Sequence, residues 1–224
     1  MPGSSCIKVF TFGWSPELVI RPLVEEGISR DEPIVLVTNK PETEYARKRF
    51  EEAYQHVVTF LRMAGVDEVR YVEVDLEGDF LDVCLDIVRT IRSFHGDCYK
   101  FYLAGGMRLL VATALIVARL LLTAGTRVEV RLSMEDRPVL HSVPAELLTL
   151  DLGELTEAQL ELLKYLRSLG RAGFEDLAIG RASTTARKLL TKLRGKGLVE
   201  YRNVGRKQVY KLTKIGELVL ELLG

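Results

Sequence analysis

The feature that most restricts the fold of this chain is a regular alternation of short strand-like runs and longer helix-like stretches in its amino-terminal part. The runs are rich in β-branched and aromatic residues and have polar, glycine or proline residues on both sides. The first four cover residues 7–12, 34–38, 69–74 and 99–103. Such alternation predicts an α/β fold with a parallel sheet, because parallel neighbours need helix-length crossovers.

The stretches between these runs have the spacing of helices. We expect helices over residues 15–26, 42–64, 79–94 and 107–123. Ser15 is placed to cap the first of them, with Pro16 as its first residue. The fourth is apolar on almost every side, which places it in the interior or at a subunit interface. Residues 128–132, 139–143 and 147–152 are expected to close the sheet as strands.

Loops that follow the strands are the first places to look for a ligand. In an open parallel sheet, ligands bind beyond the carboxyl ends of the strands, where the strand order reverses. Gly105 and Gly106 precede the fourth helix, so backbone N–H groups there can approach an anion that the helix dipole favours. Arg108 adds a guanidinium suited to phosphate. The alternative is that the two glycines make only a tight connection.

Several common chemistries lack their sequence signatures. The glycines do not form GxGxxG, and GxxxxGK[ST] is absent, which disfavours a dinucleotide dehydrogenase and a P-loop nucleotidase. Cys6, Cys84 and Cys98 form no CxxC pair and no metal spacing with histidine, so we expect neither a disulfide framework nor a metal site. We therefore expect an intracellular, cytoplasmic protein. Its longest apolar run, residues 109–118, is too short to span a membrane.

The zero net charge hides a division of the chain. Residues 1–153 carry 17 basic and 23 acidic side chains, whereas residues 154–224 carry 14 basic and 8 acidic ones. Within residues 181–214, 11 Lys or Arg stand beside a single acid, Glu200. This pattern is typical of a surface that meets phosphates, although a solvated face has the same composition. A linker near Gly153 divides the chain into domains 7–152 and 153–224.

The basic part has the pattern of a winged helix-turn-helix. Thr156 and Gln159 form a capping box that opens one helix, and a short helix covers 174–179. A third helix is expected to be capped by Thr184 or Ser183 and to run to about Arg194. Residues 198–202 and 208–212 follow as a hairpin with a basic tip. A helix of this size fits the major groove of DNA, and a dimer suits a twofold operator. The candidate DNA-binding residues are Thr184, Thr185, Arg187, Lys188, Lys192, Arg206 and Lys207. The alternative is a winged helix used for protein contacts.

The whole sequence resembles the archaeal CRISPR-associated transcription regulators that join a CARF domain to a winged helix. The resemblance is carried by Phe12-Gly13-Trp14, by Gly105-Gly106-Met107-Arg108 and by the segment 212–216, LTKIG. It implies a Rossmann-like CARF domain that binds cyclic oligoadenylate, usually cyclic tetra-adenylate, across a homodimer interface. The implied ligand-binding residues are Gly13, Trp14, Ser15, Thr38, Asn39, Ala104, Gly105, Gly106, Met107 and Arg108. Ala104 stands where the family often has a hydroxyl residue.

Three functions remain open at this point. The first is a ligand-responsive DNA-binding regulator of a CRISPR-Cas system. The second is a ring nuclease that degrades cyclic oligoadenylate, and the third is a regulator that senses another anionic nucleotide. Residues 13–16, 39–41 and 104–108 contain no histidine or carboxylate to act as general base, so we expect binding without turnover and assign no catalytic residue.

Overall fold

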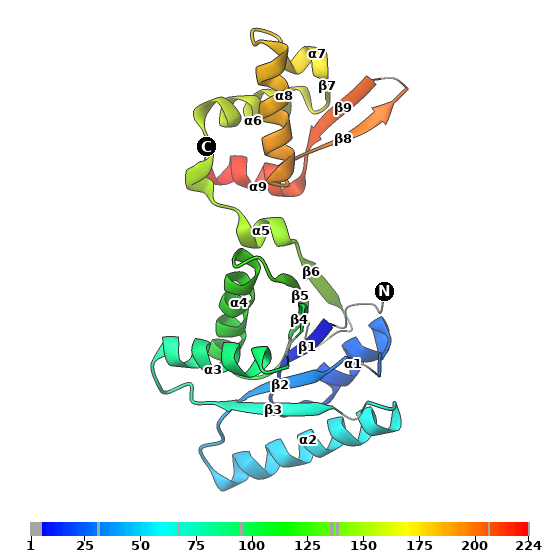
Figure 1. Ribbon diagram of the computed structural model, residues 1–224, viewed down its shortest axis with the longest axis vertical. Helices are drawn as coiled ribbons and strands as arrows, with labels where there is room; N and C mark the ends of the chain where they lie inside the picture. The colour runs from blue at the N-terminus through cyan, green and yellow to red at the C-terminus, as the bar shows by residue number, and fades with distance from the viewer. Residues whose placement is uncertain are drawn as a thin grey trace. The chain divides into compact units, whose positions relative to one another are not determined.

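Buried β-branched and aromatic residues pair as expected into one six-stranded sheet in the computed structural model (Figure 1). The structure describes residues 6–223 except positions 31, 67, 95, 135, 136, 138 and 206. The strands are β1 (Cys6–Thr11), β2 (Ile34–Asn39), β3 (Val69–Val74), β4 (Cys98–Leu103), β5 (Arg127–Ser133) and β6 (Leu140–Val143). Their order is β3-β2-β1-β4-β5-β6, and only β6 is antiparallel to its neighbour.

Helices cover the two faces of this sheet in pairs. α1 (Glu17–Glu26) and α2 (Glu44–Met63) pack on one face around a core that contains Phe10, Phe50 and Tyr102. α3 (Phe80–Arg92) and α4 (Arg108–Thr123) pack on the other, around Phe101 and Val117 (Figure 1). The chain therefore leaves the neighbouring strands β1 and β4 toward opposite faces, which makes their carboxyl ends the switch point of the sheet.

Local rules predict the structure of this unit with two exceptions, one at a helix end and one at a strand. Thr43 caps α2 and Asp79 caps α3 through side-chain hydrogen bonds. The expected Ser15 cap is wrong, because α1 begins at Glu17 and Pro16 occupies the N-cap position. The closing strand expected at 147–152 is also wrong. This segment forms the short helix α5 (Ala145–Thr149) and a 3₁₀ turn, η1 (Leu152–Glu154).

The prediction of no disulfide is wrong as well. Cys6 and Cys98 are joined by a disulfide, with Cα atoms 4.7 Å apart and a sequence separation of 92. They stand opposite each other in the parallel register of β1 and β4. Cysteine spacing along the chain contains no information on this pairing, because strand register brings the two sulfurs together. Cys84 is free and buried, and burial raises the pKa of its thiol.

A second compact unit begins at Thr149, a few residues before the boundary expected near Gly153. Its elements are α6 (Glu157–Leu169), β7 (Ala172–Gly173), α7 (Phe174–Leu177), α8 (Ser183–Gly195), β8 (Val199–Val204), β9 (Lys207–Leu212) and α9 (Lys214–Leu223). Three antiparallel strands in the order β7-β9-β8 complete a winged helix. The capping box of Thr156 and Gln159 is present. Neither Ser183 nor Thr184 caps α8, whose N-cap residue is Ala182.

A helix needs both length and apolar character to cross a bilayer. None of the helices in the described part of the chain combines the two.

Candidate functional site

A cavity of about 490 Å³ opens at the switch point of the six-stranded sheet. Its walls come from the loop after β1, the loop after β2 with the first residues of α2, and the turn before α4. The lining residues are Phe12, Gly13, Trp14, Ser15, Thr38, Asn39, Pro41, Glu42, Thr43, Ala46, Phe50, Gly106 and Met107. Most of this wall is apolar or aromatic, as in sites that enclose a planar ligand group.

Glycines allow two of these loops to touch. A Cβ atom on Gly13 would lie 2.9 Å from the backbone nitrogen of Gly106. Gly106 has a φ of +88°, and a Cβ there would lie 3.1 Å from the carbonyl oxygen of Phe12. A side chain at either position would therefore force the loops apart. The two glycine-containing loops therefore form a tight connection, and Gly13 and Gly106 also line the cavity.

The turn before α4 leaves backbone donors available. Thr11 accepts two of the backbone N–H groups, that of Ala104 at its Oγ1 (3.1 Å) and that of Gly105 at its carbonyl oxygen (3.3 Å). Among the described residues, the N–H groups of Gly106 and Met107 have no partner, and no side chain caps α4. Because α4 is 16 residues long, its start combines free donors with the positive end of a helix dipole at the cavity.

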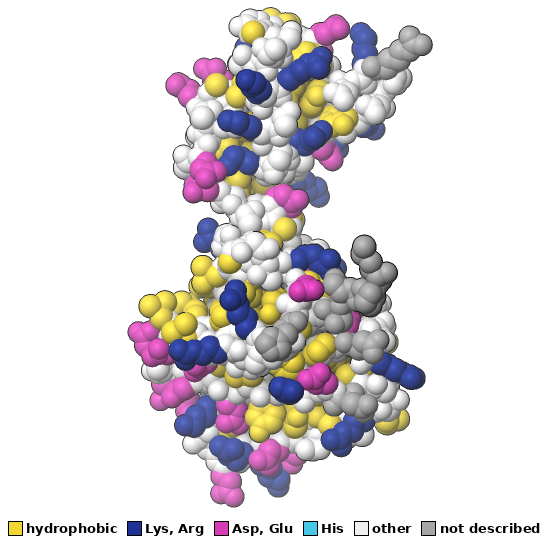
Figure 2. All heavy atoms as spheres, viewed as in Figure 1, with side chains coloured by type: hydrophobic (Ala, Val, Ile, Leu, Met, Phe, Trp, Pro, Cys, Tyr) yellow, Lys and Arg dark blue, Asp and Glu magenta, His cyan; other side chains and the backbone are white. Residues whose placement is uncertain are grey.

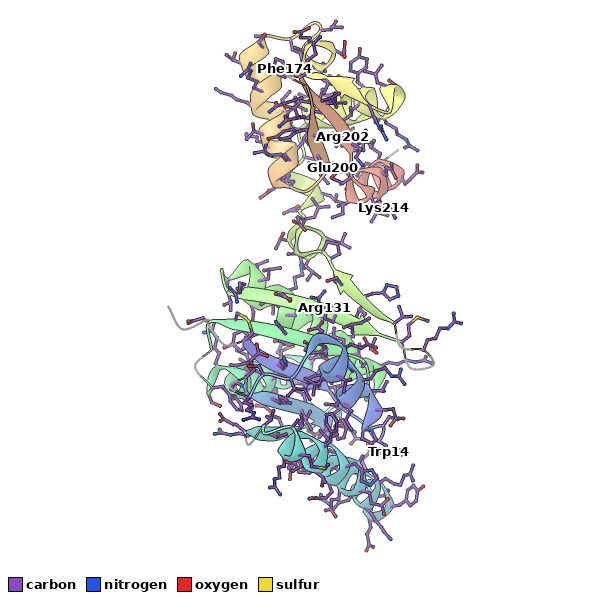
Figure 3. All side chains as sticks on the ribbon, turned by 90° about the vertical axis from the view of Figure 1, so that its right-hand side faces the viewer. Trp14, Arg131, Phe174, Glu200, Arg202 and Lys214 are labelled. Atoms are coloured by element: carbon purple, nitrogen blue, oxygen red, sulfur yellow. A yellow bond between two sulfur atoms is a disulfide. The ribbon has the colours of Figure 1, made fainter. Side chains whose placement is uncertain are left out.

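Aromatic rings stand at the rim. The side chain of Trp14, the single tryptophan of the chain, is 53% exposed. Its ring meets that of Tyr45 edge-on, with ring centroids 6.4 Å apart. Trp14 therefore lies beside the first turn of α2 and does not anchor the core (Figure 3). An exposed pair of rings of this kind can stack on a nucleobase.

The structure gathers most but not all of the candidate ligand residues. Seven of them line the cavity, namely Gly13, Trp14, Ser15, Thr38, Asn39, Gly106 and Met107. Ala104 and Gly105 are buried and do not line this cavity, and Arg108 lies exposed on the first turn of α4, also outside the lining set. Among the described residues, no group of three or more His, Cys, Asp or Glu side chains is arranged to hold a metal.

Sequence reasoning missed the start of α2, and with it Glu42. The three loops considered in the sequence contain no carboxylate, but the cavity extends beyond them to Glu42, next to Pro41. The loop after β2 extends to the N-cap residue Thr43, beyond the end chosen from the sequence. Extending each loop to the cap of its following helix would have found Glu42.

The candidate DNA-binding residues of the second unit are exposed where the structure describes them. Thr184, Thr185, Arg187, Lys188 and Lys192 lie on α8, and Lys207 opens β9. Lys and Arg side chains gather along α8 in Figure 2. Arg206 lies outside the described residues.

A groove of about 890 Å³ separates α8 from the hairpin of β8 and β9, and it adds Arg194 to the candidate DNA-binding residues. Arg187 and Arg194 lie two turns apart on α8 and both line it. The guanidinium of Arg187 lies 4.9 Å from the ring centroid of Phe174 (Figure 3). That of Arg194 lies 5.3 Å from the ring centroid of Tyr201. Each ring holds a charged group at the groove.

An apolar surface covers part of the first unit. Leu81 and Leu85 on α3 are 67% and 46% exposed, and Leu109, Ile116 and Leu120 on α4 are 45%, 41% and 54% exposed. Hydrophobic side chains gather at the surface over α3 and α4 in Figure 2. Helical positions 109, 116 and 120 share one side of α4, so this apolar face is continuous.

Fold and cavity together define a class: a Rossmann-like domain with a site at its switch point, followed by a winged helix with a basic recognition helix. Residues 7–144 match the family model of the Csa3 CRISPR-associated Rossmann-like domain. The chain belongs to this family, which confirms the resemblance seen in the sequence.

Solved structures resemble the second unit. A cysteine-to-serine mutant of MarR from E. coli is 24% identical over 31% of this chain and 54% of its own, with a TM-score of 0.30. A homodimeric winged helix-turn-helix domain from Mycobacterium bovis, described as a possible ArsR-family transcriptional regulator, is 35% identical over 30% of this chain and 61% of its own, with a TM-score of 0.27. The chain thus spans little more than half the length of these proteins. No curated protein matches it.

Proposed function

We propose that this protein is a ligand-responsive DNA-binding regulator of a CRISPR-Cas system, whose Rossmann-like domain binds cyclic oligoadenylate in a homodimer. The observation that carries the proposal is the cavity at the switch point, which joins uncapped backbone donors of α4 to exposed aromatic rings. Phosphate suits the donors and a nucleobase suits the rings. Membership of a CRISPR-associated family makes cyclic tetra-adenylate the first ligand to test.

The apolar face of α3 and α4 supports the homodimer. A second copy of the same face is its simplest cover, because a twofold interface pairs identical patches. Burial of Ile116 and Leu120 against their copies would remove from water a surface that is costly for a monomer. A ring ligand with twofold symmetry can then meet two equivalent cavities.

The basic groove of the winged helix supports DNA binding. Arg187, Arg194 and Lys207 place three cations along one groove, which Glu175 and Asp176 also line. A phosphodiester backbone can meet the three cations between recognition helix and wing. Ligand that changes the dimer geometry would change the separation of the two copies of α8, and so the affinity for a twofold operator.

Calorimetric titration of the full chain with cyclic tetra-adenylate tests the sensor part. Cyclic hexa-adenylate and linear oligoadenylate serve as controls. We expect saturable binding with one ring per two chains. No binding of either ring would overturn the proposed ligand and leave the cavity to another anionic nucleotide, which competition binding with mononucleotides would then identify.

Ring cleavage is the second candidate function, and Glu42 is the observation that favours it. A carboxylate at the cavity can accept a proton from a ribose 2′-hydroxyl. Intact ring and its linear products, separated after incubation with excess protein, discriminate the two functions. We expect the ring to persist, and rapid loss that depends on Glu42 would replace the binding proposal with an enzyme.

A further inference from the structure

We infer that Glu42 is a specificity-determining residue of the cavity, which accepts a hydrogen bond from the exocyclic amine of adenine. This inference rests on the proposed function. It names the feature of the ligand that the acidic part of the cavity lining recognises.

Glu42 is the one charged side chain among the lining residues that the structure describes. It directly precedes Thr43, whose side chain caps α2 by accepting a hydrogen bond from the Ala46 N–H (3.1 Å). This cap holds the backbone of Thr43, the residue that follows Glu42. In the described part of the chain, Glu42 has neither an ion pair nor a hydrogen-bond partner, so its carboxylate is available to a ligand.

The cavity lining contains two electrostatically different groups. Gly106 and Met107 present N–H groups that no described residue accepts, at the positive start of α4. Glu42 presents an acceptor with a full negative charge. A phosphate beside Glu42 would be repelled, so a nucleotide is oriented with its phosphate toward α4 and its base toward α2.

Aromatic rings line the same cavity as Glu42. Trp14 and Phe50 are among the lining residues, and the ring of Tyr45 meets that of Trp14 edge-on. A purine that stacks there presents its 6-position to the neighbouring side chains. Adenine has a donor at this position, whereas guanine has an acceptor, which a carboxylate rejects. A carboxylate that faces the 6-position therefore favours a purine with a 6-amino group, for a chemical reason that is independent of ring size.

The test compares two rings that differ only in this amine. Cyclic tetra-adenylate and the corresponding ring of purine riboside, which lacks the 6-amino group, are titrated into the wild-type chain and the Glu42→Ala variant. The ratio of the two affinities in each protein gives a double-mutant cycle, which removes any difference in stacking between the bases. Glu44→Ala is the matched control, because Glu44 lies in the first turn of α2 but outside the cavity lining.

We expect wild type and Glu44→Ala to prefer the adenine ring by about tenfold or more, as for a hydrogen bond to a charged acceptor. Glu42→Ala should reduce this preference to the contribution of stacking alone, and Glu42→Gln, which keeps a neutral acceptor, should lie between.

Two results would overturn the assignment while leaving the proposed function intact. One is an unchanged preference in Glu42→Ala. The other is tighter binding of both rings by Glu42→Ala to the same extent, which would show that Glu42 faces phosphate. Absence of binding of either ring to the wild-type chain would overturn the proposed function and this assignment together.

Discussion

The position of a Cβ atom on Gly13 lies 2.9 Å from the backbone nitrogen of Gly106, although the two residues are far apart in sequence. The contact joins the loop after β1 to the turn before α4, the two loops that diverge at the switch point. Backbone groups of these loops supply one wall of the cavity, so the shape of the cavity depends on the absence of a side chain at Gly13.

Gly13→Ala should separate these loops. We expect a loss of about 1–3 kcal/mol in the free energy of unfolding, typical of overpacking, and weaker binding of cyclic tetra-adenylate. Urea unfolding followed by fluorescence of Trp14 and calorimetric titration measure the two effects. Gly78→Ala is the control, because a Cβ atom on residue 78 would lie 3.4 Å from its nearest neighbour, the carbonyl oxygen of Asp75, which is an ordinary van der Waals distance. Equal behaviour of the two variants would contradict the steric argument.

Arg108→Ala should lower ligand affinity and leave stability unchanged. Arg108 is exposed on the first turn of α4 and contributes to no described ion pair, so the folded protein does not need its charge. A ring shared by two chains extends beyond one cavity, where this guanidinium can meet phosphate. We expect a loss of about tenfold or more in affinity, as for one charged hydrogen bond. A collapse of the thermal midpoint instead would show that Arg108 is structural.

Periodicity and strand-end rules predicted the sheet, its helices and the winged helix, because these depend on local spacing of apolar residues. The same rules located the cavity, since it lies where parallel strands end. These rules did not predict Glu42 as a site residue, because they place the end of the loop after β2 at Pro41, whereas it extends to Thr43. The Cys6–Cys98 bond escaped because strand register, which sequence spacing does not contain, decides which cysteines meet. Residues 147–152 have the composition of a strand, but Leu148 packs on the first core and Leu152 on the second.

Because of the Tyr102 hydroxyl, the free energy of unfolding should fall as the pH rises above about 10. Tyr102 is fully buried, donates to Glu26 Oε2 at 2.6 Å, and stacks on Phe10. Burial first, and then the bond to Glu26, raise the pKa of Tyr102 far above its ordinary value near 10. In the unfolded chain the Tyr102 hydroxyl ionises near pH 10, whereas in the folded chain it stays protonated there. Its contribution to the free energy of unfolding is therefore complete below pH 10 and falls by about 1.4 kcal/mol for each pH unit above it.

Tyr102→Phe isolates this effect. The variant should be less stable at pH 8 by about 1–2 kcal/mol, since Glu26 loses a donor, and should lose less stability than wild type between pH 10 and 11. Urea midpoints from Trp14 fluorescence measure both. Tyr54→Phe is a suitable comparison, because the hydroxyl of Tyr54 also has a raised pKa but is only partly buried. Parallel curves for wild type and Tyr102→Phe would refute the argument.

Arg187 and Arg194 should contact DNA backbone. Both line the groove beside the wing and are held by aromatic rings. We expect Arg187→Ala, Arg194→Ala and Lys188→Ala each to weaken binding to duplex DNA and to reduce the slope of log affinity against log salt by about 1. Fluorescence polarisation over a salt series measures this slope. Lys164→Ala, which removes an exposed lysine from α6, should leave it unchanged. An unaltered slope in a groove variant would show that its side chain does not face phosphate.

Charge on the apolar face of α4 should abolish the dimer. Ile116→Glu with Leu120→Glu would bury four carboxylates in a twofold interface, a cost that exceeds the gain from apolar contact. Sedimentation velocity should show a dimer for wild type and a monomer for the double variant, with thermal stability of the monomer unit retained because both side chains are already exposed. Met63→Glu, a charge on the 85% exposed methionine of α2, should remain dimeric. If the double variant stays dimeric, another surface joins the chains; if it is monomeric and still binds cyclic tetra-adenylate with wild-type affinity, one cavity suffices and the shared ring is wrong.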